Sequence, residues 1–370
     1  MKKSRNLTFS ILSFLGIVLV MMGHLNIGWL DFVGIFPYYS FHVLIFVFVS
    51  GYFYNPNDEK HVFKYIWRKF LRLMVPYYIW NIVYGLIAMM LRRGGFEIGE
   101  EFNLWNVFVA PIIGGHQFMY NAPAWFVPAL FLLEVCNILA RKILSIVRIR
   151  NEYFLFVLYL VLGIATVYLA KRGSVYDYYK IPGRLLIMAP IFGLGRLYND
   201  RLEEKESRLP FYVVIPCLFI VNVLLTRWQG GLGYSVVWVT GFAGSVVTPF
   251  ITAITGIWLW LWISRILGKL TGFMSGIWNY LGAHTFSIMM HHLTMFMIVK
   301  AVFCVLGRRI EMFSDFQVEN FVSDIYYTYL PNGNAVWCIL YLVAGIAGSL
   351  LIGELTKKLT VRMSKIKIRD

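Results

Sequence analysis

Residues Ile17 to Leu25 read IVLVMMGHL, and this stretch contains the pattern that predicts the fold. Eight of its nine residues are apolar or glycine, and the remaining one is His24. The apolar run that surrounds it, from about 9 to 29, has the roughly 20 residues that a helix needs to cross a bilayer. An ionisable ring inside such a run is costly, which makes His24 a candidate functional residue.

The same apolar pattern recurs along the whole chain of 370 residues, which is 59% hydrophobic and only 14% charged, with a mean hydropathy of +0.66. Soluble domains carry about 25% charged residues. We therefore expect an all-α, polytopic integral membrane helix bundle that forms a single domain over residues 1–370. About ten transmembrane helices are expected, at roughly 9–29, 34–54, 70–91, 123–144, 153–170, 182–198, 210–226, 236–268, 280–305 and 335–356.

The net charge of +15 follows the predicted spans. Basic clusters flank alternate spans, which with ten spans places both termini in the cytoplasm and explains the charge through topology and anionic lipid rather than nucleic acid. The span 236–268 is too long for one straight crossing and contains Gly241, Gly244 and Pro249. It is either a broken helix or a re-entrant segment plus a helix, and two crossings here would give eleven spans. We expect a multi-pass protein of the plasma membrane, in bacteria the inner membrane.

Several ionisable residues lie inside these spans at similar depths. His24 lies about 22 Å along a helix that begins on the inside, and His42 lies in the outer half of the next span. His291 and His292 lie near mid-membrane and are about 100° apart around their helix, so at most one faces a given site. One such histidine is as readily explained by a hydrogen bond between helices. Four at compatible depths favour a site, in which a histidine serves as general base.

A basic stretch, WRKFLRLMVPYYIW at 67–80, precedes the third span. Arg68 and Arg72 are four residues apart and share one helical face with guanidinium groups that suit phosphate oxygens. The alternative is ordinary anchoring at the cytoplasmic side of the membrane.

Other catalytic signatures are missing from the sequence. It contains no P-loop, no GxGxxG between a strand and a helix, no HExxH and no GxSxG. The four cysteines lie in apolar runs without metal-ligand spacing, so we expect no metal. Nucleotide hydrolysis, hydride transfer and zinc proteolysis therefore have no support.

A series of motifs resembles the acyltransferase-3 family of integral membrane acyltransferases. In order, these are SILSFLGIVLVMMGH, FPYYSFHVLIFVFVSGYFYNP, WRKFLRLMVPYYIW, APAWFVPALFLLE and LGAHTFSIMMHH. The block FHVLIFVFVSGYF is most similar to the fucose-4-O-acetylase-like branch. The resemblance implies ten or eleven helices and transfer of an acyl group, usually acetyl from acetyl-CoA, onto a hydroxyl of a glycan or related envelope molecule.

The resemblance also implies residue roles. His24 matches the histidine held to be catalytic, His42 and His292 match further motif histidines, and Arg68, Lys69 and Arg72 match the basic stretch that meets the phosphates of CoA. Many members carry an arginine eleven residues before the first-helix histidine, where this chain has Ser13. Another cation, such as Arg184 or a cytoplasmic basic residue, must substitute, or CoA is held differently.

The resulting hypothesis is acyl transfer at a buried site, with His24 as general base and acyl-CoA reaching up from the cytoplasm. Trp125 stacks on a sugar ring or serves only as an interface residue. Arg184 and Glu134 are further acceptor-side candidates, the first to stabilise an oxyanion or orient the acceptor and the second to orient a histidine. The partners are then acyl-CoA, a glycan or small hydroxyl acceptor, and the bilayer. The rival functions are an envelope glycan or lipid transporter and a structural membrane protein.

Overall fold

The computed structural model describes residues 6–25, 38–206, 208–229 and 233–366, with side chains up to residue 358. These residues form helices joined by loops and contain no β-strand, as expected for an all-α bundle. The α-helices are α1 (Leu7–His24), α2 (Leu44–Tyr52), α3 (Val62–Lys69), α4 (Val75–Arg93), α5 (Ala110–Ile113), α6 (Phe126–Ile146), α7 (Glu152–Lys171), α8 (Lys180–Leu197), α9 (Glu203–Glu206), α10 (Phe211–Gln229), α11 (Thr248–Leu270), α12 (Ser275–Ala283), α13 (Thr285–Leu306), α14 (Val318–Ser323) and α15 (Cys338–Ile366).

Eight segments of the described chain are long and apolar enough to cross a membrane. They are Leu7–His24, Pro56–Arg93, Ala122–Ile146, Glu152–Lys171, Phe211–Gln229, Thr248–Leu270, Thr285–Leu306 and Ala335–Lys358. The other two expected spans correspond to α2, whose 9 residues are too few for a full crossing, and α8, which carries Lys180, Arg184 and Arg196. Residues 26–37, where the first expected span ends and the second begins, lie outside the described residues.

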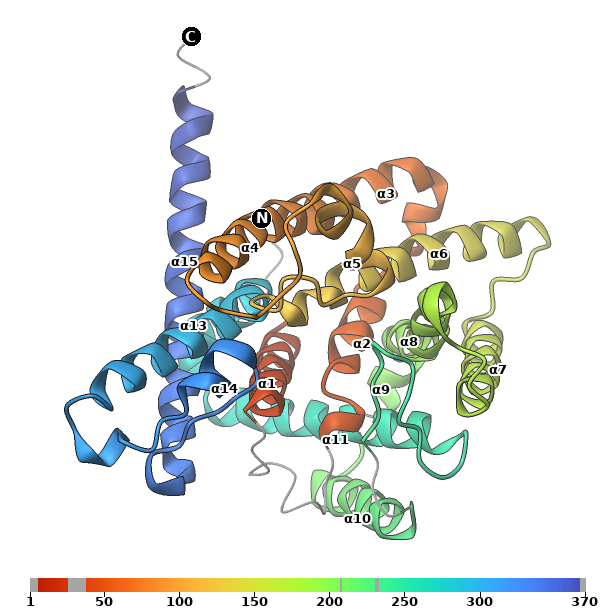
Figure 1. Ribbon diagram of the computed structural model, residues 1–370. Helices are drawn as coiled ribbons and strands as arrows, with labels where there is room; N and C mark the ends of the chain where they lie inside the picture. The colour runs from red at the N-terminus through yellow and green to blue at the C-terminus, as the bar shows by residue number, and fades with distance from the viewer. Residues whose placement is uncertain (1–5, 26–37, 207, 230–232, 367–370) are drawn as a thin grey trace.

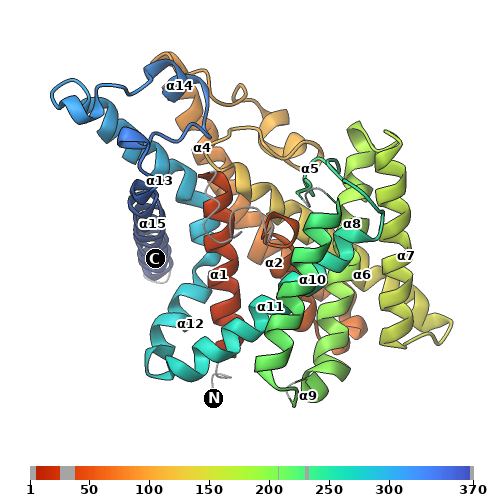
Figure 2. The ribbon, with the colours of Figure 1, turned by 90° about the horizontal axis from the view of Figure 1, so that it is seen from below.

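Helix α1 lies in the interior of the bundle, with α15 on one side of it and α7 on the other (Figures 1 and 2). It contacts α2, α11, α12, α13 and α15. Most of its side chains are buried, as expected for a helix that is apolar on all faces. Helices α7, α10 and α15 keep most of their apolar side chains exposed, which fits contact with lipid.

Helices α2 and α8 cross at very close range. A Cβ placed on Gly51 would lie 2.0 Å from the carbonyl oxygen of Phe192, and one placed on Gly195 would lie 2.1 Å from that of Phe48. Small residues on facing surfaces let membrane helices approach until their backbones touch, which supplies van der Waals contact where the hydrophobic effect cannot drive association. The short helix α2 is therefore fixed in place by α8.

The loop after α10 corrects one sequence expectation. The predicted span 236–268 is helical only from Thr248, and residues 233–247 form a loop with an isolated antiparallel bridge between Ser235 and Thr240. Positive φ angles at Val239, Gly241 and Gly244 keep this loop out of a helix. The eleven-span alternative needs a second crossing helix here, and residues 233–247 contain none.

We expect Gly195→Ala to destabilise the protein by about 1–3 kcal/mol, because the added methyl group must push α2 away from α8. Thermal unfolding of the detergent-solubilised protein measures this as a lower Tm. Gly276→Ala is the matched control, because a Cβ at that position meets nothing within 4 Å. Equal Tm values for the two variants would contradict the packing argument.

Candidate active site

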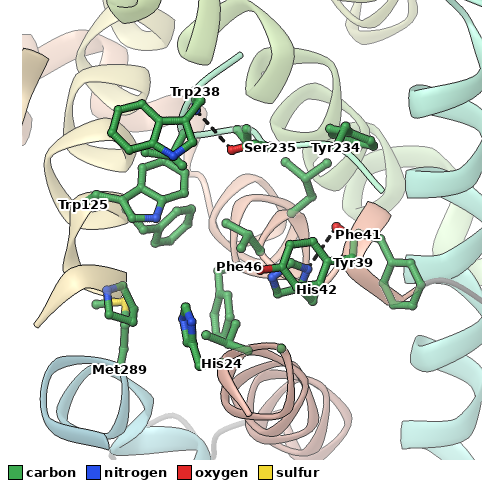
Figure 3. Close-up of a pocket in the computed structure, with 18 of the residues that line it drawn as sticks. His24, Tyr39, Phe41, His42, Phe46, Trp125, Tyr234, Ser235, Trp238 and Met289 are labelled. Carbon is green, nitrogen blue, oxygen red and sulfur yellow. Dashed lines mark hydrogen bonds between the residues drawn. The ribbon is translucent and has the colours of Figure 1, made fainter. Parts of the chain in front are cut away.

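A cavity of about 800 Å³ lies where α1 ends and contains two of the predicted histidines. Its walls come from α1, residues 39–46, residues 116–126, the loop 233–247, α13 and the loop that holds Tyr326. This volume is within the roughly 300–1,000 Å³ typical of small-molecule sites. Figure 3 shows His24 and His42 in the wall of the cavity, with Trp238 on the side opposite His24.

His24 ends α1 and lies among aromatic rings. Its imidazole stacks against that of His292, with ring centres 5.4 Å apart, and against the phenol of Tyr326 at 5.5 Å. The contact with His292 joins α1 to α13, so two histidines that are 268 positions apart in the sequence form one pair. The sequence analysis named both His24 and His292 as candidate site residues, and the structure places their rings in contact.

Two histidines have their protonated nitrogen defined by a backbone carbonyl. His42 Nδ1 lies 3.1 Å from the carbonyl oxygen of Tyr39, and His292 Nδ1 lies 2.7 Å from that of Ile288. A carbonyl only accepts, so in the neutral ring Nδ1 carries the proton and Nε2 keeps the lone pair. The Nε2 of His292 is buried and has no hydrogen-bond partner. Both rings are thus arranged to accept a proton at Nε2.

His291 has a different environment from its neighbour. Its Nδ1 lies 2.7 Å from the hydroxyl of Tyr84, and its ring meets the edge of Trp80 at 4.2 Å. These contacts connect α13 to α4. His291 and His292 therefore face different partners, as their separation of about 100° around the helix predicts. His292 packs on His24, and His291 hydrogen-bonds to Tyr84 of α4.

Two tryptophans contribute to the cavity wall. Trp125, just before α6, is 7% exposed and lines the cavity, and its contact with an acceptor stays a prediction. Trp238, from the loop 233–247, also lines it and meets the ring of His116 edge-on at 5.2 Å. The indole rings of Trp125 and Trp238 are visible on the same side of Figure 3.

Arg184 is 2% exposed and holds the cavity wall together. Its guanidinium donates to the carbonyl oxygens of Val237 at 2.6 Å, Ile113 at 2.7 Å, and Ile112 and Gly114 at 3.2 Å. The predicted contact of Arg184 was with an acceptor or an oxyanion. The structure gives it backbone carbonyls from the end of α5 and from the loop 233–247 as partners, and Arg184 is not among the residues that line the cavity.

Glu134 pairs with a predicted donor-binding residue. It is 1% exposed and accepts from Lys69 Nζ at 2.6 Å and from the hydroxyl of Ser50. Its second carboxylate oxygen is buried without a partner. The hypothesis that Glu134 orients a histidine thus finds no such contact among the described residues, and Glu134 belongs instead with the basic stretch of α3.

The side chains of the basic stretch point in two different directions. Lys69 reaches inward to Glu134, whereas Arg68 and Arg72 line a shallow surface depression with Lys64 and Trp67. Arg68 also pairs with Asp58 at 2.8 Å. The helix widens to a π-helical turn at Phe70–Met74, just before Pro76, which has no N–H to continue the regular hydrogen-bond ladder.

Sequence reasoning missed three residues of the cavity, His116, Trp238 and Tyr326. His116 lies in the stretch PIIGGHQFMYNAP, an outer loop for which the sequence gives no depth, and the other two lie in loops without helical periodicity. Burial, followed by the nearby charge of Arg184, lowers the pKa of His116 to about 4, so this ring is neutral at pH 7. Only the folding of the loops onto the bundle brings these residues to the site.

We expect Arg184→Lys to lower the free energy of unfolding by about 1–3 kcal/mol. The lysine ammonium lacks the planar guanidinium group, whose separate nitrogens donate at once to the carbonyls of Val237 and Ile113. The loss is measured as a fall in Tm of the purified protein. Arg93→Lys, at an exposed position at the end of α4, is the matched control. An unchanged Tm for Arg184→Lys would show that the loops are held by other contacts.

Comparison with known proteins identifies the family. The acyltransferase-3 family, described as an acyltransferase domain, matches residues 9–354. Neither the curated proteins nor the solved structures give a match to this chain. The family match covers nearly all of the sequence, including every segment that lines the cavity. The chain therefore belongs to the acyltransferase-3 family of membrane acyltransferases.

Proposed function

We propose that this protein is a membrane O-acyltransferase that moves an acetyl or other short acyl group from acyl-CoA onto a hydroxyl of a cell-envelope glycan. One observation carries the proposal. His24 and His42 line the same cavity, and His292 packs against His24. His24 and His42 supply the cavity with proton-transfer groups whose ordinary pKa lies close to neutrality, and His292 supports His24 from behind the wall.

In this proposal the reaction is a single displacement. The imidazole of His24 takes the proton of the acceptor hydroxyl as its oxygen attacks the carbonyl carbon of the thioester. The tetrahedral intermediate then expels the thiolate of CoA, which takes the proton back from the imidazolium. The products are an O-acyl ester and CoA with a free thiol, so protons and acyl group balance.

His42 and His292 support this chemistry in different positions. His42 presents a lone pair at Nε2 from the wall of the cavity, because its Nδ1 is held by the carbonyl of Tyr39. His292 is fully buried behind His24 and contacts its ring. We assign His42 to the acceptor hydroxyl or a second proton transfer. We assign His292 to positioning His24, since no wall of the cavity is formed by His292.

The donor is assigned to the cytoplasmic basic stretch. Arg68, Arg72 and Lys64 share a surface depression with the indole of Trp67. Three cations beside an aromatic ring suit the phosphates and adenine of CoA. In this arrangement Arg68 exchanges its ion pair with Asp58 for a phosphate oxygen.

The position of Ser13 suggests which cation replaces the arginine common in the family. Helices α1 and α2 run antiparallel, with Gly16 close to Ile45 and the ring of Phe9 stacked on Tyr52. Ser13 therefore lies at about the level of Ser50, which donates to Glu134. Lys69 joins the same carboxylate from α3. We assign to Lys69 the inward-facing positive charge that Ser13 does not provide.

We expect His24→Ala to reduce acyl transfer by roughly 10²–10⁴-fold, the usual contribution of a general base. The measurement is incorporation of labelled acetyl from acetyl-CoA into envelope glycan at equal protein level. His61→Ala, at an exposed position before α3, is the control. Undiminished labelling with His24→Ala would exclude the assigned base. Acceptor transport without acetyl-CoA would favour a transporter.

We expect the pair Arg68→Ala with Arg72→Ala to weaken binding of acetyl-CoA at least about tenfold, through loss of charged hydrogen bonds to phosphate. Calorimetric titration of the purified protein measures the Kd directly. The matched double variant is Arg93→Ala with Arg308→Ala, which removes two exposed arginines elsewhere. Equal affinities for both double variants would move the donor site away from α3.

A further inference from the structure

The described residues that line the cavity beside His24 are apolar or polar, and none is formally charged. Among the lining residues that the structure describes, none is aspartate, glutamate, lysine or arginine. Its polar groups are three histidines, hydroxyl groups and indole nitrogens. An anion inside such a cavity would lose its hydration and gain no counter-ion.

Arg184 and Lys180 lie near the cavity but do not line it. Arg184 lies behind the wall, where it donates to four backbone carbonyls. Lys180 Nζ lies 5.4 Å from the centre of the Trp238 ring, and Lys180 is not among the lining residues. Neither offers its charge to a molecule beside His24.

The side of the cavity away from His24 suits a sugar ring, which has an apolar face and hydroxyl groups at its edge. Trp125 and Trp238 provide flat apolar surface there. His116 lies against Trp238, and its Nε2 is buried without a hydrogen-bond partner. A sugar ring suits this side, since its apolar face stacks on indole and its hydroxyl groups hydrogen-bond with the polar atoms of the wall.

We propose that the unit acylated by this protein is an uncharged sugar, selected by Trp238 and His116 against sugars that carry a carboxylate or phosphate. The proposal rests on the acyltransferase function proposed above and adds the chemical class of its acceptor. Trp238 lines the cavity on the side opposite the general base (Figure 3), and His116 lines it in contact with Trp238, which makes both of them specificity-determining residues in this proposal.

The polar groups in the wall also distinguish a sugar from a purely aliphatic acceptor. Ser235 and His24 line the cavity and are partly exposed, so an alkyl chain that filled the space would leave their polar groups without hydrogen bonds. A neutral sugar replaces those bonds through its hydroxyl groups. It also carries no charge that the cavity would leave unpaired.

The first test identifies the acylated unit. Purified protein in lipid vesicles is incubated with isotope-labelled acetyl-CoA and total envelope glycan of the host, and tandem mass spectrometry locates the label. Acetyl on a sugar without an ionisable group is the expected result. Acetyl on a uronic acid, on a phosphate-bearing unit or on a lipid alcohol would overturn the neutral-sugar proposal while leaving acyl transfer intact. Absence of label from every product would overturn acyl transfer, and the present proposal with it.

The second test measures Trp238 directly. With the same glycan as varied substrate, Trp238→Ala should raise KM for glycan roughly threefold to tenfold through lost ring stacking. The KM for acetyl-CoA and kcat should change less than about twofold. Trp228→Ala is the matched control, because Trp228 is 72% exposed and lies on α10 outside the cavity wall.

A conservative variant separates recognition from folding. Trp238→Phe keeps an aromatic ring and should restore most of the glycan affinity that Trp238→Ala loses. Wild-type KM for glycan in Trp238→Ala would overturn the role of Trp238. The role of Trp238 would also be overturned if Trp238→Phe raised the KM for glycan as much as Trp238→Ala does while its Tm stayed unchanged.

Discussion

The guanidinium of Arg184 is the contact on which the cavity depends. It gathers the carbonyls of residues 112–114, at the C-terminal end of the short helix α5, and of Val237, in the loop 233–247. Non-helical backbone that is buried in a membrane protein needs donors for its carbonyl groups, because lipid provides none. The hydroxyl of Tyr234 acts in the same way on the carbonyl of Ser40. These side chains allow irregular loops to close over the end of α1.

The histidines lie in different environments. Two residues adjacent in the sequence, His291 and His292, point to different partners, because successive side chains on a helix are about 100° apart. His24 ends α1 and His42 lies in the turn before α2, and both line one cavity. The ion pair of Lys69 with the buried Glu134 joins α3 to α6 and forms a separate polar centre. The histidines and this ion pair are thus held by different helices.

Much of the fold was predictable because the bilayer restricts the choice. Runs of about 20 apolar residues located the long helices, and each of the ten expected spans corresponds to a helix of the structure. The sequence could not give the length of α2, since its surroundings are equally apolar. It also failed at residues 236–247, where hydropathy resembles a span but positive φ angles and bonds from Arg184 stabilise a loop.

By itself, the sequence determined the membrane bundle and the family and made His24 a candidate, because hydropathy and ordered motifs are local properties of the chain. Tertiary structure alone decided which polar residues meet. It placed Arg184 on carbonyls, turned Glu134 toward Lys69 and added His116, Trp238 and Tyr326 to the cavity. The physical reason is that a side chain's partners depend on helix rotation and loop closure, which no local pattern records.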